Sequence, residues 1–240
     1  MPNKHEFPAN EKKGVYRAIM LRRDIRSQFK PDPIPDDVLA RILYAGHHSG
    51  SVGFMQPWNF ILIRDSEVKK RVRAGFEREN QAAAQNYEGE RKDKYVSLKL
   101  EGILEAPLNL CVTCDTERGG PHVLGRNTIR ETDLFSTCCA IQNLWLAARS
   151  EGIGMGWVSI LKNEEVKKIL NIPATVIPVA YLCLGYVTEF PPRPMLETAG
   201  WEKRIPLDEL VYFEKWQEKN LKDLDQFKSL WKDLEKEPFS

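Results

Sequence analysis

The chain has 240 residues, 42% of them apolar, and a formal net charge of +1. This composition fits one compact domain, or one domain with an extension, and excludes both global disorder and the basic surface of a nucleic-acid binder. No apolar run approaches the roughly 20 residues of a membrane span and the polar start, Met1 to Glu11, carries no hydrophobic signal segment, so we expect a cytoplasmic protein.

The first third of the chain predicts two helices, a loop and a strand. One helix runs toward Arg22, and the three prolines that follow it indicate an extended link. A second helix is capped by Asp36 or Asp37 and repeats apolar residues every three or four positions. The sequence from Ser49 to Gly53 breaks that pattern and predicts a loop. A buried strand over 59–64 follows it.

The middle of the chain predicts further helices around a second strand. The ranges 67–87 and 92–104 are predicted helices, and 108–113 is a strand. The range 118–130 is a loop rich in glycine and basic residues. The most apolar helix covers 134–149.

Two more strands and a helix complete the predicted core. Glycines at 152, 154 and 156 indicate a turn into a strand over 157–160. A helix over 163–170 leads to a strand over 176–184. Strands that alternate with longer helices indicate an α+β or α/β sandwich.

The end of the chain predicts a charged helix from Glu214 to Glu235. Its apolar residues recur every three or four positions and must cover another surface. They are Leu221, Leu224, Phe227, Leu230, Trp231 and Leu234. We therefore divide the chain into a main domain, 1–213, and a C-terminal helical extension, 214–240.

The first candidate site is the run from Arg22 to Arg26. Three guanidinium groups within five residues can clamp a phosphate, although on spacing alone a solvated basic face of an ordinary helix is the simpler interpretation. A regular helix turns about 100° per residue, so Asp24 would point away from the arginines. Asp24 can join them only if the helix ends near Arg23.

Two more segments offer polar groups. Ser51 to Trp58 provides a hydroxyl, an amide and backbone N–H groups, which could lie along a planar heterocycle; alternatively, it is a structural loop whose Trp58 fills the core. Gly152 to Ser159 allows close backbone approach and supplies the Ser159 hydroxyl. Its G-x-G-x-G spacing after a helix does not match the dinucleotide fingerprint, and a purely structural turn is the simpler interpretation.

The cysteines and histidines do not predict a metal site. Four of the five cysteines lie in apolar sequence and are predicted to be buried. Cys111 and Cys114 form a C-x-x-C motif, but residues three apart on a strand point to opposite faces, which is poor geometry for a shared metal. His47 and His48 are adjacent at a predicted helix end, where capping is the simplest role.

Taken in order, these segments resemble the nitroreductase-like flavoprotein superfamily. An early R-R-x-x-R is followed by S-x-x-x-x-Q-P-W and then by a glycine-punctuated turn before a strand. A finer resemblance is to its aerobic 5,6-dimethylbenzimidazole synthase branch. Four segments carry it: Arg22–Arg26, Ser51–Phe60, Cys111–Gly120 and Gly156–Ile160.

The resemblance implies an α+β fold, with a central, mostly antiparallel sheet flanked by helices. It also implies an intertwined homodimer with FMN at the subunit interface. It places FMN-binding residues in three segments of the chain. These residues are Arg22, Arg23, Asp24, Ile25, Arg26, Ser51, Met55, Gln56 and Ser159.

The resemblance assigns the chemistry to Asp24 and Ser159. Most of the superfamily has a serine where Asp24 stands, and a carboxylate beside a phosphate is costly unless the arginines compensate. The branch fragments reduced FMN with dioxygen, and one ribityl carbon enters the benzimidazole ring of the vitamin B12 lower ligand. Asp24 is suited to general acid/base work there, and Ser159 to orienting the flavin or relaying a proton. A separate flavin reductase would supply reduced FMN.

Two alternatives stay open. The chain could be an NAD(P)H-dependent nitroreductase-like enzyme that recycles FMN, or a non-catalytic flavin-binding scaffold whose C-terminal helix recruits a partner. Asp24 argues against the first, and Asp24 together with Ser159 against the second. Two departures from the branch are Gly50, where a proline is expected, and the long C-terminal helix.

Overall fold

A computed structural model describes residues 4–236 of the chain. The chain forms two compact units. The larger unit is Leu21–Pro194, and the smaller one combines the described parts of Met1–Met20 and Met195–Ser240. The candidate site residues lie in the larger unit.

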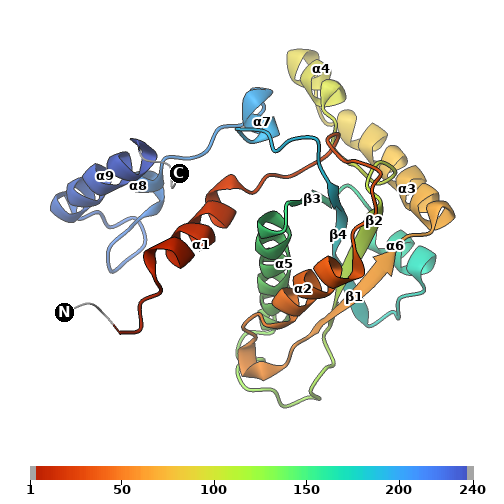
Figure 1. Cartoon of the computed structure of the whole chain (residues 1–240), viewed down its shortest axis with the longest axis horizontal. Helices are drawn as coiled ribbons and strands as arrows, with labels where there is room; N and C mark the ends of the chain where they lie inside the picture. Colours follow the sequence, from red (N-terminus) through yellow and green to blue (C-terminus); the bar gives the residue numbers. More distant parts are fainter. Residues whose placement is uncertain (1–3, 237–240) are drawn as a thin grey trace. The chain divides into compact units, whose positions relative to one another are not determined.

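A four-stranded antiparallel sheet forms the centre of the larger unit (Figure 1). Its strands are β1 (Trp58–Ile63), β2 (Leu108–Asp115), β3 (Ile153–Val158) and β4 (Val176–Tyr186). Their order in the sheet is β1-β2-β4-β3, so β1 and β3 are its two edges. The predicted antiparallel α+β architecture is confirmed.

Helices cover both faces of the sheet. They are α2 (Asp36–His47), α3 (Ser66–Ala84), α4 (Gly89–Ser97), α5 (Thr132–Ser150) and α6 (Asn163–Leu170), with a short 3-10 turn, η1, at Val52–Phe54. Alternate residues of β2 point to opposite faces. Leu110 packs into the core with Ile42 of α2 and Leu144 of α5, whereas Cys111 packs with Val72 of α3 and Val166 of α6.

The smaller unit contains α1 (Ala9–Leu21), which crosses into the larger unit at its last residue, α7 (Met195–Thr198), α8 (Leu207–Leu210) and α9 (Leu221–Lys236). An ion pair of 3.0 Å between Asp208 and Lys228 joins α8 to α9. The C-terminal helix begins at Leu221, so the prediction of helix from Glu214 was wrong. Glu214 and Gln217 have φ of 61° and 62°, and a left-handed backbone cannot continue an α-helix. The domain division at 213/214 stays a prediction.

Two other predicted elements differ from the structure. The helix predicted over 92–104 is α4, which ends at Ser97 because Leu98 is extended. The glycine turn is shorter than predicted, since only Gly152 has a positive φ, while Gly154 and Gly156 lie inside β3. The strand accordingly ends at Val158 rather than at residue 160.

The cysteines divide between core and surface. Cys111, Cys114 and Cys183 are buried, as predicted, whereas Cys138 and Cys139 on α5 are exposed. The prediction of four buried thiols was therefore wrong for one of them, because helix α5 turns Cys138 away from the sheet. None of the helices in the described part of the chain combines the length and the apolar character of a membrane span.

Candidate functional site

The run from Arg22 to Arg26 lies along β3. Helix α1 ends at Leu21, which meets the condition under which Asp24 can join the arginines. The backbone N–H of Ile25 donates to the Met155 carbonyl over 3.0 Å, and Asp24 forms a parallel bridge with Met155. A Cβ on Gly156 would collide with the Ile25 carbonyl oxygen. The glycine therefore permits the close backbone approach that the sequence suggested.

The Asp24 carboxylate is held at both oxygens. Its Oδ1 accepts a hydrogen bond of 2.9 Å from the backbone N–H of Trp157, and its Oδ2 pairs with Nη2 of Arg26. The side chain of Asp24 is 37% exposed and that of Arg26 only 10%. The carboxylate is thus fixed in orientation but remains open on one side.

The three arginines have different partners. Arg26 also donates to the Leu100 carbonyl. The guanidinium of Arg22 lies over the Trp145 ring, 5.1 Å from its centroid. Arg23 donates to the carbonyls of Arg22 and Pro192 over 2.7 and 2.6 Å. A clamp in which all three hold one phosphate stays a prediction.

Some guanidinium donors of this segment are available for a ligand. The Nε atoms of Arg22 and Arg26 are buried and lack a hydrogen-bond partner within the described part of the chain. A buried donor without an acceptor costs free energy, and an anionic oxygen would satisfy it. The donor set of this segment therefore fits a phosphate.

Ser159 follows β3 directly, two residues beyond Trp157. Its side chain is exposed. It lines a hollow of about 140 Å³ with Trp157 and Tyr181. It also lines a wider one of about 420 Å³ with Glu79 of α3 and with Asn86, which follows that helix. Ser159 and Asp24 thus lie at the same edge of the sheet.

The Ser51 loop is tightly wound. Gly53, Phe54 and Gln56 have φ of 58°, 52° and 47°, a region that non-glycine residues rarely adopt. The Ser51 hydroxyl accepts a hydrogen bond of 3.2 Å from the Gln56 backbone N–H. The N–H of Val52 donates to the Ser136 hydroxyl of α5 over 3.2 Å. Strained backbone conformations of this kind are stabilised by surrounding contacts and are frequent at functional sites.

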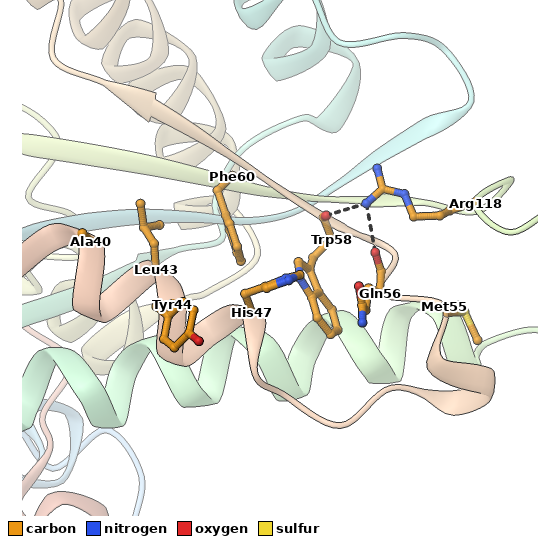
Figure 2. A pocket seen from close by; sticks show the side chains of 9 residues that line it. All are labelled: Ala40, Leu43, Tyr44, His47, Met55, Gln56, Trp58, Phe60 and Arg118. Atoms are coloured by element: carbon orange, nitrogen blue, oxygen red, sulfur yellow. Dashed lines mark hydrogen bonds between the residues drawn. The ribbon is translucent and has the colours of Figure 1, made fainter.

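A pocket of about 440 Å³ opens beside this loop (Figure 2). Its lining is rich in aromatic rings and comes from α2, the Ser51 loop, β1 and the loop after β2: Ala40, Leu43, Tyr44, His47, Met55, Gln56, Trp58, Phe60 and Arg118. Trp58 is 3% exposed and donates to Nδ1 of His47 over 3.3 Å. Trp58 fills the core, as the structural interpretation of the loop predicts, and its neighbours line a pocket. Binding of a planar ring along the loop stays a prediction.

Two arginines without a predicted role adjoin this pocket, since Arg118 lines it and Arg126 contacts its Met55. Arg118 donates to the carbonyls of Gln56 and Trp58, each over 2.9 Å. Arg126 forms a buried ion pair of 3.0 Å with Asp133 and approaches the Met55 sulfur within 3.5 Å. The available signal was the cluster of basic residues in a glycine-rich loop directly after a strand.

The two groups of candidate residues lie at opposite edges of the sheet. Asp24 and Ser159 adjoin β3, whereas Ser51 to Gln56 precede β1, and the strands β2 and β4 separate the two edges. One chain therefore does not bring all the candidate residues together. This separation follows from the strand order, which the local sequence does not reveal.

Two thiols and a tyrosine hydroxyl buried in the core behind the site stay protonated and unreactive. Burial raises the pKa of the Cys111 thiol to about 12, and burial likewise raises the pKa of Cys183 and of the Tyr181 hydroxyl. All three are protonated at neutral pH, and a protonated thiol is neither a nucleophile nor a metal ligand. No group of three or more His, Cys, Asp or Glu side chains among residues 4–236 is placed to hold a metal ion.

Known proteins resemble this chain in sequence and in fold. The model of the nitroreductase family matches residues 19–186. A 5,6-dimethylbenzimidazole synthase of Rhodospirillum rubrum is 42% identical over 200 residues, which cover 83% of this chain and 94% of the relative. One of Rhodobacter capsulatus is 36% identical, covering 84% and 97%. A crystal structure of iodotyrosine deiodinase bound to FMN and 3-iodo-L-tyrosine has a TM-score of 0.65 at 22% identity, covering 84% of this chain and 100% of that one.

Proposed function

Because this chain belongs to the nitroreductase family, we propose that it works as a 5,6-dimethylbenzimidazole synthase. In this reaction reduced FMN is fragmented with dioxygen, and the product is the lower-ligand base of vitamin B12. The observation that carries the proposal is the Asp24 carboxylate, which Trp157 and Arg26 orient at the edge strand that Ser159 follows. An enzyme that only recycles FMN has no evident use for an acid/base group at this place.

The residues present fit FMN in their chemistry. The buried Nε donors of Arg22 and Arg26 suit the phosphate, with Arg23 and Ile25 completing that end. Ser51, Met55 and Gln56 adjoin the aromatic pocket, which suits the ring system. When bound and reduced, FMN supplies the electrons that activate dioxygen and the carbon that joins the product ring.

Asp24 is the group that moves protons. Its fixed carboxylate can take a proton from the ribityl chain and return it to a departing oxygen. The Trp157 N–H and the Arg26 guanidinium keep the carboxylate in one orientation, so that acid/base transfer needs no side-chain search. The Ser159 hydroxyl at the same edge serves to orient the flavin or to relay a proton.

The complete site needs two copies of the chain. Since the two groups of residues lie at opposite edges of the sheet, a second chain can supply Ser51, Met55 and Gln56 to the Asp24 of the first. An exposed apolar surface beside the Ser51 loop supports such an interface, because Phe54 and Leu124 are each 82% exposed. Large exposed apolar groups mark interaction sites. A flavin reductase completes the set of partners by supplying reduced FMN.

One experiment tests the proposal. The purified protein is mixed with chemically reduced FMN in air, and the products are analysed by mass spectrometry. We expect 5,6-dimethylbenzimidazole in amounts that grow with time. Recovery of intact oxidised FMN alone would overturn the proposal. NAD(P)H consumption with a nitroaromatic would then assign an FMN-recycling nitroreductase, and neither activity would leave a flavin-binding scaffold.

A further inference from the structure

The geometry points to Glu101 as a positioning residue that sets the Arg26 guanidinium and, through it, the Asp24 carboxylate. This inference rests on the proposed function insofar as Arg26 binds FMN. Glu101 acts on Arg26 and Asp24 indirectly. Its effect is carried by the backbone of residues 100–103, and no motif in the sequence singled it out.

Glu101 is an acidic residue with 2% of its side chain exposed. Its Oε2 accepts a hydrogen bond of 2.7 Å from the Ile103 backbone N–H. Its Oε1 accepts from Lys99 Nζ over 2.7 Å and lies 3.3 Å from Arg73 Nη1. A buried carboxylate persists only when such partners compensate its desolvation, so these contacts hold it in one place.

The contact with Ile103 fixes a turn in an otherwise irregular segment. Residues 98–102 belong to neither helix nor strand, and the carboxylate bridges the backbone two residues ahead. The carbonyl of Leu100, which immediately precedes Glu101, accepts a hydrogen bond from Arg26 Nη1. The direction of that carbonyl depends on the turn that Glu101 holds.

Gly102 lets the same turn pack directly against the backbone of Arg26. A Cβ at this position would lie 2.5 Å from the Arg26 carbonyl oxygen and 2.7 Å from the Phe29 ring. The turn and the backbone of Arg26 are therefore packed without room for a side chain. A shift of one must move the other.

The contacts form one continuous path. Glu101 sets the turn, the Leu100 carbonyl holds one Nη of Arg26, and the other Nη holds Asp24. Groups behind a site that lock the rotamers of binding residues commonly decide their precision. Glu101 thus keeps the guanidinium fork at a fixed angle, with its Nε free for an anion.

A double-mutant cycle on FMN binding tests this path. The dissociation constant of oxidised FMN is measured by fluorescence titration for the native protein, Glu101→Ala, Arg26→Ala and the double variant. We expect Glu101→Ala to weaken binding about tenfold in the native background and less than about twofold beside Arg26→Ala, because coupled residues are not additive. An equal loss in both backgrounds would overturn the inference, since general damage to the fold does not depend on Arg26.

Three further variants control for other causes of a loss of FMN binding in Glu101→Ala. Glu101→Gln keeps an oxygen for the Ile103 N–H, so we expect binding within about threefold of native; a loss as large as that of Glu101→Ala would count against the turn as the cause. Glu105→Ala removes the other carboxylate that pairs with Lys99 and should bind FMN normally. If Glu101→Ala does not fold, Gly102→Ala replaces it in the cycle with the same expectation.

The cycle separates this inference from the proposed function. FMN can bind without being converted to benzimidazole. Coupling between Glu101 and Arg26 in a protein that forms no benzimidazole would therefore contradict only the proposed activity. Benzimidazole formation together with additive effects of Glu101→Ala and Arg26→Ala on FMN binding would contradict only the role of Glu101.

Discussion

The backbone N–H of Trp157 lies 2.9 Å from the Asp24 carboxylate and donates a hydrogen bond to it. This contact ties a residue that follows a helix to the edge strand β3, across more than a hundred residues of sequence. Trp157 lies two residues before Ser159, which directly follows the same strand. The two proposed catalytic side chains are therefore placed by one strand.

Asp24→Asn should separate binding from chemistry. Asparagine keeps an oxygen for the Trp157 N–H but cannot act as a general base, so we expect benzimidazole formation to fall at least about a hundredfold. The FMN dissociation constant should stay within a few-fold of native, because the arginines remain. Asp32→Asn changes an exposed aspartate nearby and should alter neither quantity. Loss of FMN binding in Asp24→Asn would instead assign Asp24 a structural role.

Gly156→Ala should destabilise the fold and displace Asp24. The added methyl would collide with the Ile25 carbonyl, so the backbone bridge to β3 has to open. We expect a loss of about 2–4 kcal/mol in the free energy of unfolding, measured by urea denaturation. Gly50→Ala meets no atom within 4 Å and should stay within about 0.5 kcal/mol of native. Equal stability of the two variants would contradict the close approach.

Arg126→Ala should cost far more stability than the loss of a surface ion pair. It leaves the Asp133 carboxylate, 3% exposed, buried without its partner, which typically costs about 3–5 kcal/mol. Arg41→Ala removes ion pairs from a side chain that is 53% exposed, and we expect less than about 1 kcal/mol. Thermal and urea unfolding of both variants provide the comparison, and similar losses would show that the Arg126 pair is not buried in solution.

The three buried thiols should react much more slowly with a thiol reagent than the exposed Cys138 and Cys139. Burial raises the pKa of Cys111 to about 12 and that of Cys114 and Cys183 above the usual range, so these three stay protonated and covered at pH 8. We expect a thiol-specific disulfide reagent to reach them only after unfolding in urea. Mass spectrometry of the labelled peptides identifies each site. Fast labelling of Cys111 in the folded protein would refute its place in the core.

Leu124→Asp should weaken both the proposed homodimer and its FMN site. A charge on a surface that is 82% exposed in one chain costs little in the monomer but is unfavourable inside an interface. We expect a shift toward monomer by light scattering and a parallel loss of FMN binding. Arg71→Asp places the same side chain on an exposed position of α3. It should leave the molar mass measured by light scattering unchanged. A Leu124→Asp dimer with native affinity for FMN would place the interface elsewhere.

Part of this architecture could be predicted from sequence. The strands β1, β2 and β4 follow from apolar runs of the right length. The first helix was predicted to run toward Arg22 and ends at Leu21. Gly154 and Gly156 were assigned to a turn because a glycine carries no side-chain signal for a strand. Both lie in β3, at positions where Ile25 and Val187 occupy the space of a side chain.

Other features depend on contacts between distant residues and leave no local pattern. The burial of Arg126 requires Asp133 and two loop carbonyls, none of which distinguishes it from other basic residues of the loop. The turn held by Glu101 replaces the predicted end of a helix. The separation of Asp24 from Gln56 depends on the order of strands in the sheet.

That separation has a genetic consequence. If each site combines Asp24 of one copy with Gln56 of another, a chain damaged at Asp24 and a chain damaged at Gln56 are both inactive alone. Co-expressed, they can pair so that one of the two sites receives two sound halves and the other receives both defects. Two recessive alleles of a single gene would then complement each other, with activity limited to the mixed dimers.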